Sequence, residues 1–172
     1  METHMENNKM LYSHVSVDCV LLGVNEDKLC VLLIERQMDN SDEKRYKLPG
    51  SLIFENEDLD TAAHRVFNEA TGLKRVPLKQ FRSFGSPSRT KNRDDMQWLE
   101  NAMKLKIERI VTVAYLALSK IGRKSNPTNK YNSLAWFPVD ALPSLPFDHK
   151  EIIEAAVEEI RSGLKRNHPS FS

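Results

Sequence analysis

Two acidic side chains and one basic side chain with the potential for catalysis or metal binding lie close together between residues 48 and 73. Glu57 precedes a segment with helical periodicity, and Arg65 and Glu69 lie four residues apart within that segment. A carboxylate that accepts hydrogen bonds from a guanidinium fork forms a strong structural pair where water is excluded. An exposed pair at helical spacing contributes only about 0.2–0.5 kcal/mol. A purely structural role as an ion pair can therefore explain Glu57 and Arg65. Glu69 is either another structural partner or a contact for a metal ion or ligand.

Three further side chains could take part in binding. Asp18 interrupts an apolar run, where an unpaired charge would be costly, so we expect it to have a partner or to line a pocket. Trp98 lies in a charged segment and is interpreted as a lid or interface residue, with stacking on a ligand as the alternative. His149 is interpreted as a residue of a helix first turn rather than as a metal ligand.

Two helices with distinct ends should position some of these residues. Apolar residues recur at helical spacing before Gly72, and Asp58 can serve as an N-cap, which predicts a helix over 58–71. A second helix should begin at Asp148, whose carboxylate would cap it with Glu151 as the capping-box partner.

Strands account for most of the remaining apolar segments. β-Branched and leucine-rich runs over 15–23 and 29–35 predict a hairpin. The polar stretch 36–45 is interpreted as a loop, and residues 87–106 as an excursion that contains a short helix. Further strands are expected over 78–85, 107–118 and 134–137, with a short apolar piece at 52–54. This order indicates an α/β (or α+β) fold with a mixed sheet flanked by helices.

Length and composition limit the classes of protein that this chain can represent. The 172 residues, 40% hydrophobic and 28% charged, predict one globular domain with a real core. The net charge of +1 argues against strong attraction to nucleic acid or to an anionic membrane. No apolar stretch approaches the roughly 20 residues of a membrane span, and the polar start does not resemble a secretory signal, so we expect a cytoplasmic protein. Cys19 and Cys30 are expected to be reduced, buried thiols.

Residues 48–73 read LPGSLIFENEDLDTAAHRVFNEATGL, which resembles the Nudix box. That motif is a loop and helix of the form Gly, five residues, Glu, seven residues, Arg-Glu-hydrophobic-any-Glu-Glu-any-Gly-hydrophobic, and Thr71-Gly72-Leu73 sets the register here. The segment AWFPVDALP at 135–143, followed by FDH at 147–149 and a helix, also resembles the end of a Nudix domain. The resemblance implies a mixed β-sheet sandwiched between helices over 13–165, with a flexible N-terminus at 1–12 and a tail at 166–172.

Departures from the box affect the metal site that the resemblance implies. Ser51 takes the place of the box glycine, whereas Glu57 and Arg65 match, which implies that they hold the loop against the helix. Of the three helix carboxylates that the family uses for metal, Glu69 alone is present, since the other two positions are Val66 and Ala70. These positions share a helix face about 100° wide, where three carboxylates would converge on a hard cation. We therefore expect weak metal binding at best, with Mg²⁺ or Mn²⁺ needed only for residual hydrolysis.

Two segments beside the excursion resemble one branch of the family, the Nudix-related transcriptional regulators. They are FGSPSR at 84–89 and RIVTVAY at 109–115. In that branch a hydrolytically degenerate Nudix domain binds a small effector, and a C-terminal winged helix binds DNA. The resemblance implies that Phe84, Arg89 and Arg109, with Asp18, contact the ligand, and that the protein is a homodimer. Because the chain stops at Ser172, we expect either a truncated effector domain or a stand-alone protein, without strong DNA binding of its own.

Three functions remain open from the sequence. The favoured one is a binding module for a sugar, a nucleotide sugar or an ADP-ribose-like molecule. The alternative is a metal-dependent Nudix hydrolase that cleaves a nucleoside diphosphate linked to another group. In that case Glu57 and Glu69 would act with replacement ligands drawn from Asp94, Asp95, Glu100 and Glu108. The third is a protein-interaction scaffold.

Overall fold

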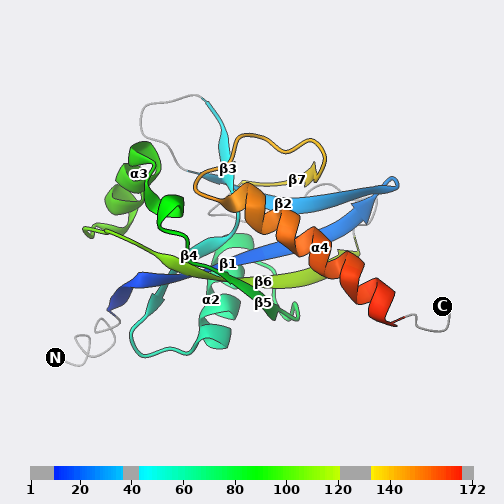
Figure 1. Ribbon diagram of the computed structural model, residues 1–172, viewed down its shortest axis with the longest axis horizontal. Coiled ribbons are helices and arrows are strands. Elements are labelled where there is room, and N and C mark those ends of the chain that lie inside the picture. The colour runs from blue at the N-terminus through cyan, green and yellow to red at the C-terminus, as the bar shows by residue number, and fades with distance from the viewer. Residues whose placement is uncertain (1–9, 37–42, 121–132, 168–172) are drawn as a thin grey trace.

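The computed structural model describes residues 10–36, 43–120 and 133–167 (Figure 1). Its strands and helices follow the predicted order closely. The strands are β1 (Leu11–Asn25), β2 (Lys28–Arg36), β3 (Arg45–Lys47), β4 (Gly50–Phe54), β5 (Lys79–Phe84), β6 (Val111–Lys120) and β7 (Leu134–Pro138). The helices are α2 (Leu59–Thr71), the 3₁₀ turn η1 (Pro87–Thr90), α3 (Arg93–Met103) and α4 (His149–Asn167).

One mixed sheet forms the centre of the described residues. Its strand order is β3-β2-β1-β6-β5, with β4 also paired to β1 and β7 also paired to β2. The β1–β6 pair is parallel and every other pair is antiparallel. Helix α2 lies against one face and α4 against the other, while α3 lies toward one end of the sheet (Figure 1). The predicted mixed sheet between helices is thereby confirmed.

Both faces of β1 are buried, which explains its almost continuous apolar sequence. Alternate residues of a strand point to opposite faces. Val17, Cys19 and Leu21 pack in the apolar cluster beneath α2, whereas Val20 and Leu22 pack in the cluster beneath α4. Asp18 shares the α4 face with these last two, and it is therefore a charged residue in the centre of an apolar layer.

The ends of α2 agree with the prediction. Asp58 is the N-cap, and its side chain accepts a hydrogen bond from the backbone N–H of Thr61 at 2.8 Å. Gly72 follows the helix with a φ of 73°, and its N–H donates to the carbonyl of Asn68. Local capping chemistry thus fixes the helix that carries Arg65 and Glu69.

Other expectations need correction. Strand β6 begins at Val111 rather than at residue 107, and β1 begins at Leu11 within the stretch expected to be flexible. Strand β3 begins at Arg45, the last residue of the expected loop at 36–45, of which residues 37–42 lie outside the described residues. The capping box at Asp148 does not form, because Asp148 Oδ2 accepts from Arg89 instead and its Oδ1 has no hydrogen-bond partner among the described residues. Helix α4 continues to Asn167, two residues into the predicted tail at 166–172. The remaining residues of the predicted N-terminus and tail, 1–9 and 168–172, lie outside the described residues.

The expectations for the two cysteines and for membrane-spanning helices can be compared with the described part of the chain. Cys19 and Cys30 are both buried and free, as expected, and burial raises the pKa of the Cys19 thiol. No helix in the described ranges is long and apolar enough to cross a bilayer.

Candidate functional site

Glu57 and Arg65 form a sheltered ion pair between the loop after β4 and helix α2. Arg65 Nη2 lies 2.6 Å from Glu57 Oε1, and Arg65 Nε donates to both carboxylate oxygens, at 3.2 and 3.0 Å. Glu57 Oε1 also accepts from the N–H of Phe54, and Arg65 donates to the carbonyl of Leu52. Burial alone would lower the pKa of Arg65, but the hydrogen bond and charge of Glu57 raise it above its usual value. These contacts agree with the interpretation of the pair as a clamp.

The residues at the family's metal-binding positions do not fit a hard cation. Val66 is buried in the core cluster beneath α2, and Ala70 packs against the same cluster. The side chain of Glu69 is two-thirds exposed and accepts a hydrogen bond from Arg65 at 3.2 Å. Mg²⁺ prefers near-octahedral oxygen ligands, and these positions supply one carboxylate.

Replacement ligands from the excursion do not gather near the box. The Asp95 carboxylate accepts a hydrogen bond from the Arg36 guanidinium at 3.1 Å and another from the N–H of Phe147 at 2.9 Å. Within the described residues, no group of three or more histidine, cysteine, aspartate or glutamate side chains is placed to hold a metal ion.

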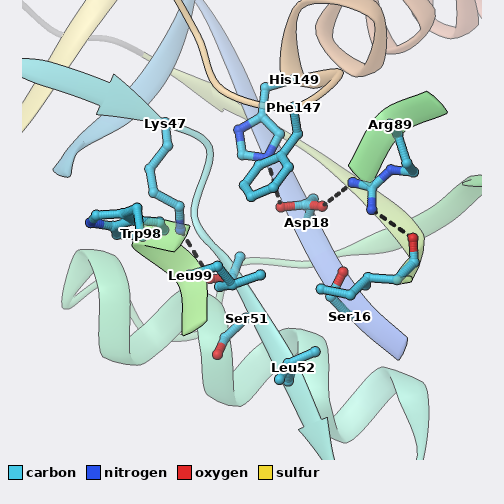
Figure 2. A pocket seen from close by; sticks show the side chains of 12 residues that line it. Ser16, Asp18, Lys47, Ser51, Leu52, Arg89, Trp98, Leu99, Phe147 and His149 are labelled. Atoms are coloured by element: carbon cyan, nitrogen blue, oxygen red, sulfur yellow. Dashed lines mark hydrogen bonds and ion pairs between the residues drawn. The ribbon is translucent and has the colours of Figure 1, made fainter. Parts of the chain in front are cut away.

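A pocket lies on the α4 face of β1, opposite to the face that α2 covers. It is bounded by the sheet, α3 and the start of α4 (Figure 2). Its enclosed part measures about 40 Å³, and the rest of it opens to solvent. The lining combines charged and aromatic side chains with an apolar wall, and it comprises Ser16, Asp18, Lys47, Gly50, Ser51, Leu52, Arg89, Trp98, Leu99, Ile110, Phe147 and His149.

A network of buried charges forms the floor of this pocket. Asp18 Oδ2 accepts a hydrogen bond from Thr112 Oγ1 at 2.6 Å and lies 3.9 Å from Arg89 Nη2. Arg89 also donates to Asp148 Oδ2 at 3.0 Å and to the carbonyl of Ile110 at 2.8 Å. Asp18 and Arg89 are 4% and 7% exposed, so the partner expected for Asp18 is present. The network spans β1, η1, β6 and the start of α4, and it ties these elements together around the pocket.

His149 is a neutral donor and acceptor in the same floor. Its Nδ1 accepts from the N–H of Leu48 at 3.1 Å, which places the ring proton on Nε2, 3.5 Å from Asp18 Oδ1. Burial lowers the pKa of His149 to about 4, although the charge of Asp18 opposes this shift. The histidine is the first residue of α4, as its interpretation as a first-turn residue requires, and it also lines the pocket.

Gly50 and Lys47 complete the side of the pocket formed by β3 and β4. A Cβ atom at Gly50 would lie 2.0 Å from Asp18 Oδ1 and 2.9 Å from the carbonyl oxygen of Val17, so only glycine allows this close approach. Lys47 is 9% exposed, and its Nζ donates to the carbonyl of Gly50 at 3.1 Å. Burial lowers the pKa of this lysine, although Asp18 opposes the shift.

Trp98 lines the pocket from α3. Its ring lies 4.9 Å from the Arg36 guanidinium and 5.8 Å from Lys47 Nζ, within the range of cation–π interaction. Asp95, on the same helix, joins Arg36 to the backbone of Phe147, as described above. Trp98 therefore belongs to the pocket lining, and its interpretation as a lid residue stays a prediction.

A family model, the NUDIX domain, matches residues 12–156. This chain belongs to the Nudix family. The ADPR responsive transcriptional repressor NtrR of Acinetobacter baylyi is 28% identical over 153 residues, which cover 86% of this chain and 54% of that protein. The chain therefore spans about half the length of this curated relative.

Two solved structures have a similar fold. NrtR of Shewanella oneidensis is 26% identical with a TM-score of 0.62, and the match covers 87% of this chain and 64% of that one. The NUDIX domain of the same protein, complexed with ADP ribose, is 24% identical with a TM-score of 0.61, and the match covers 93% of this chain and 99% of that one. This second likeness supports the Nudix fold.

The structure separates the four ligand-binding residues predicted for this Nudix chain. Asp18 and Arg89 lie together in the pocket floor. Phe84 packs against the apolar cluster beneath α4, and Arg109 is exposed and donates to the carbonyl of Gly85 at 2.8 Å, so neither lines this pocket. Lys47 was not predicted from the sequence. A lysine directly before the Leu-Pro-Gly turn that opens the Nudix box is the one local signal that could have identified it.

Proposed function

We propose that this Nudix domain binds ADP-ribose as an effector and does not cleave it. The observation that carries the proposal is the contrast between the two faces of β1. On the α2 face, Val66 and Ala70 occupy the family's metal-binding positions and pack against the core. On the α4 face, a pocket lined by buried charges and aromatic side chains is available for a ligand.

The relatives support the choice of ligand. NtrR of Acinetobacter baylyi is ADPR responsive, and the NUDIX domain of Shewanella oneidensis NrtR was crystallised with ADP ribose. An effector domain needs a binding pocket. It does not need the carboxylates that organise a metal ion for hydrolysis. A homodimer, a cytoplasmic location and weak DNA binding by this chain remain predictions within the proposal.

Calorimetric titration of the purified chain with ADP-ribose tests the binding half of the proposal. We expect saturable binding that is tighter than for AMP, free ribose or an unrelated nucleotide sugar. Absence of heat and of any thermal shift at millimolar ADP-ribose would refute it.

Chromatographic detection of AMP tests the second half, after ADP-ribose is incubated with the protein and millimolar Mg²⁺ or Mn²⁺. We expect no release above that of a protein-free control. Turnover near 1 s⁻¹, which is about the ordinary range for enzymes, would instead support the metal-dependent hydrolase.

A further inference from the structure

Lys47 has hydrogen-bonding capacity that the described residues do not use. An ammonium group has three donors, and the one hydrogen bond of Lys47 among the described residues goes to the carbonyl of Gly50. The side chain is 9% exposed and lines the pocket, so water reaches it poorly. Buried polar groups normally have at least one hydrogen-bond partner, and for Lys47 this partner is the carbonyl of Gly50. An acceptor on a ligand in the pocket could take a second of the three ammonium donors of Lys47.

Asp18 places an acceptor in the same pocket. Its carboxylate accepts from Thr112 and has Lys47, Arg89 and His149 around it. The charge of Arg89 is already balanced by its hydrogen bond to Asp148. The remaining charges in the lining are one cation, Lys47, and one anion, Asp18, so the pocket is close to electroneutral.

A neutral polyhydroxyl group matches this lining better than a phosphate does. A phosphate would bring negative charge toward the buried Asp18 carboxylate, where repulsion is strong because water is excluded. A sugar hydroxyl can accept from an ammonium, and its neighbour on the ring can donate to a carboxylate. The apolar wall of Leu52, Leu99 and Ile110 provides contact for the C–H face of the ring.

The shape of the pocket favours a group at the end of the ligand. Asp18, Arg89 and His149 close the floor, and the part of the cavity that they enclose has room for only a few water molecules. The adenosine ribose of ADP-ribose carries a base on one side and a phosphate on the other, so it cannot enter such a floor alone. The terminal ribose is attached through one carbon, so the edge of its ring that carries the hydroxyls can reach this floor from the open side of the pocket.

We propose that this pocket binds the terminal ribose of the effector, with Lys47 donating to one ring hydroxyl and Asp18 accepting from its neighbour. The inference rests on the proposed function, because it assigns one end of ADP-ribose to one site. It makes Lys47 a specificity residue that distinguishes ADP-ribose from ADP, which lacks that sugar.

The test compares ADP-ribose with ADP in calorimetric titrations of three proteins. These are the wild type, Lys47→Met, which keeps the length of the side chain without its charge, and Lys79→Met, a matched control at an exposed position on β5. Loss of a hydrogen bond from a charged donor corresponds to about a 10- to 100-fold change in affinity. We expect Lys47→Met to bind ADP-ribose more weakly by about that factor and to bind ADP as tightly as the wild type does. Lys79→Met should bind both ligands with wild-type affinity.

Each other outcome has a distinct meaning. Equal wild-type affinity for ADP and ADP-ribose, or equal weakening of both by Lys47→Met, would overturn the assignment of the terminal ribose and leave the proposed function standing. A wild type that does not bind ADP-ribose would overturn both. If Lys47→Met fails to fold, wild-type binding of an ADP-ribose analogue that lacks one terminal hydroxyl decides the matter. We expect it to lose about tenfold in affinity, and undiminished binding would refute the inference.

Discussion

Replacing Arg65 with alanine should destabilise the junction between β4 and α2. The substitution removes the guanidinium that contacts both oxygens of Glu57, the carbonyl of Leu52 and the exposed Glu69. It also removes a cation–π contact, since the guanidinium carbon lies 4.1 Å from the centre of the Phe54 ring. The Glu57 carboxylate, 11% exposed, would keep the N–H of Phe54 among its hydrogen-bond donors.

The size of the effect follows from these contacts. Removing a sheltered, charged hydrogen-bond partner costs about 1.5–3 kcal/mol of unfolding free energy. The cation–π contact adds about 0.5–1 kcal/mol, whereas the exposed pair with Glu69 adds only about 0.2–0.5 kcal/mol. Because such terms share one side chain and do not simply add, we expect Arg65→Ala to lower the free energy of unfolding by about 2–4 kcal/mol.

Urea denaturation followed by circular dichroism measures this change. Arg161→Ala is the matched control, since Arg161 is exposed on α4 and the substitution is the same. Glu57→Gln and the double variant complete a cycle, in which the double variant should lose less than the sum of the single variants. A loss in Arg65→Ala within about 0.5 kcal/mol of the control, the usual range for surface substitutions, would show that the pair does not act as a clamp.

Three other substitutions test separate parts of the structure. Gly50→Ala should lower the melting temperature and weaken ADP-ribose binding together, because its Cβ would meet the Asp18 carboxylate and a backbone carbonyl; unchanged values of both would contradict the close approach. Val66→Glu should cost about 2–4 kcal/mol in urea denaturation, since it buries a carboxylate in the core, and a stable variant that binds Mg²⁺ would show that this position faces a usable site. His149 stays neutral in the folded protein, with its pKa lowered by burial from 6.5 to about 4, so the unfolded chain binds more protons between these values and stability falls as pH drops through this window. In His149→Asn the amide oxygen can still accept from the N–H of Leu48, and the stability of this variant should fall less steeply with pH, by up to about 1.4 kcal/mol per pH unit. Parallel stability curves for the wild type and the variant would refute the lowered pKa of His149.

Local signals in the sequence were sufficient for the Nudix helix and its clamp. The N-cap of α2, its terminal glycine and the pair of Glu57 and Arg65 all involve residues fewer than fifteen positions apart. Capping and helical spacing act over such short separations, so they can be recognised without the tertiary fold. The prediction that Asp18 needs a partner is also confirmed, because it depends only on the cost of a charge in an apolar strand.

The pocket could not be assembled in the same way. Asp18 and Thr112 are 94 positions apart, Arg89 and Asp148 are 59 apart, and Leu48 and His149 are 101 apart. These partners meet because β1 and β6 pair in parallel and the start of α4 packs on the same sheet face. The same long-range contact explains the wrong prediction at Asp148, whose carboxylate binds a guanidinium from η1 instead of capping its own helix.

Strand β4 connects the box to the pocket and gives the retained box residues a role that needs no metal. Arg65 holds β4 from the α2 side through the carbonyl of Leu52, while the Leu52 side chain faces the pocket on the other side. The carbonyl of Gly50, at the start of the same strand, accepts a hydrogen bond from Lys47. Because Gly50 has no side chain, it leaves room for the Asp18 carboxylate. The clamp therefore fixes the strand against which the pocket charges are placed. If the proposed function is correct, Glu57 and Arg65 are needed without any metal ion, because they support one wall of the pocket.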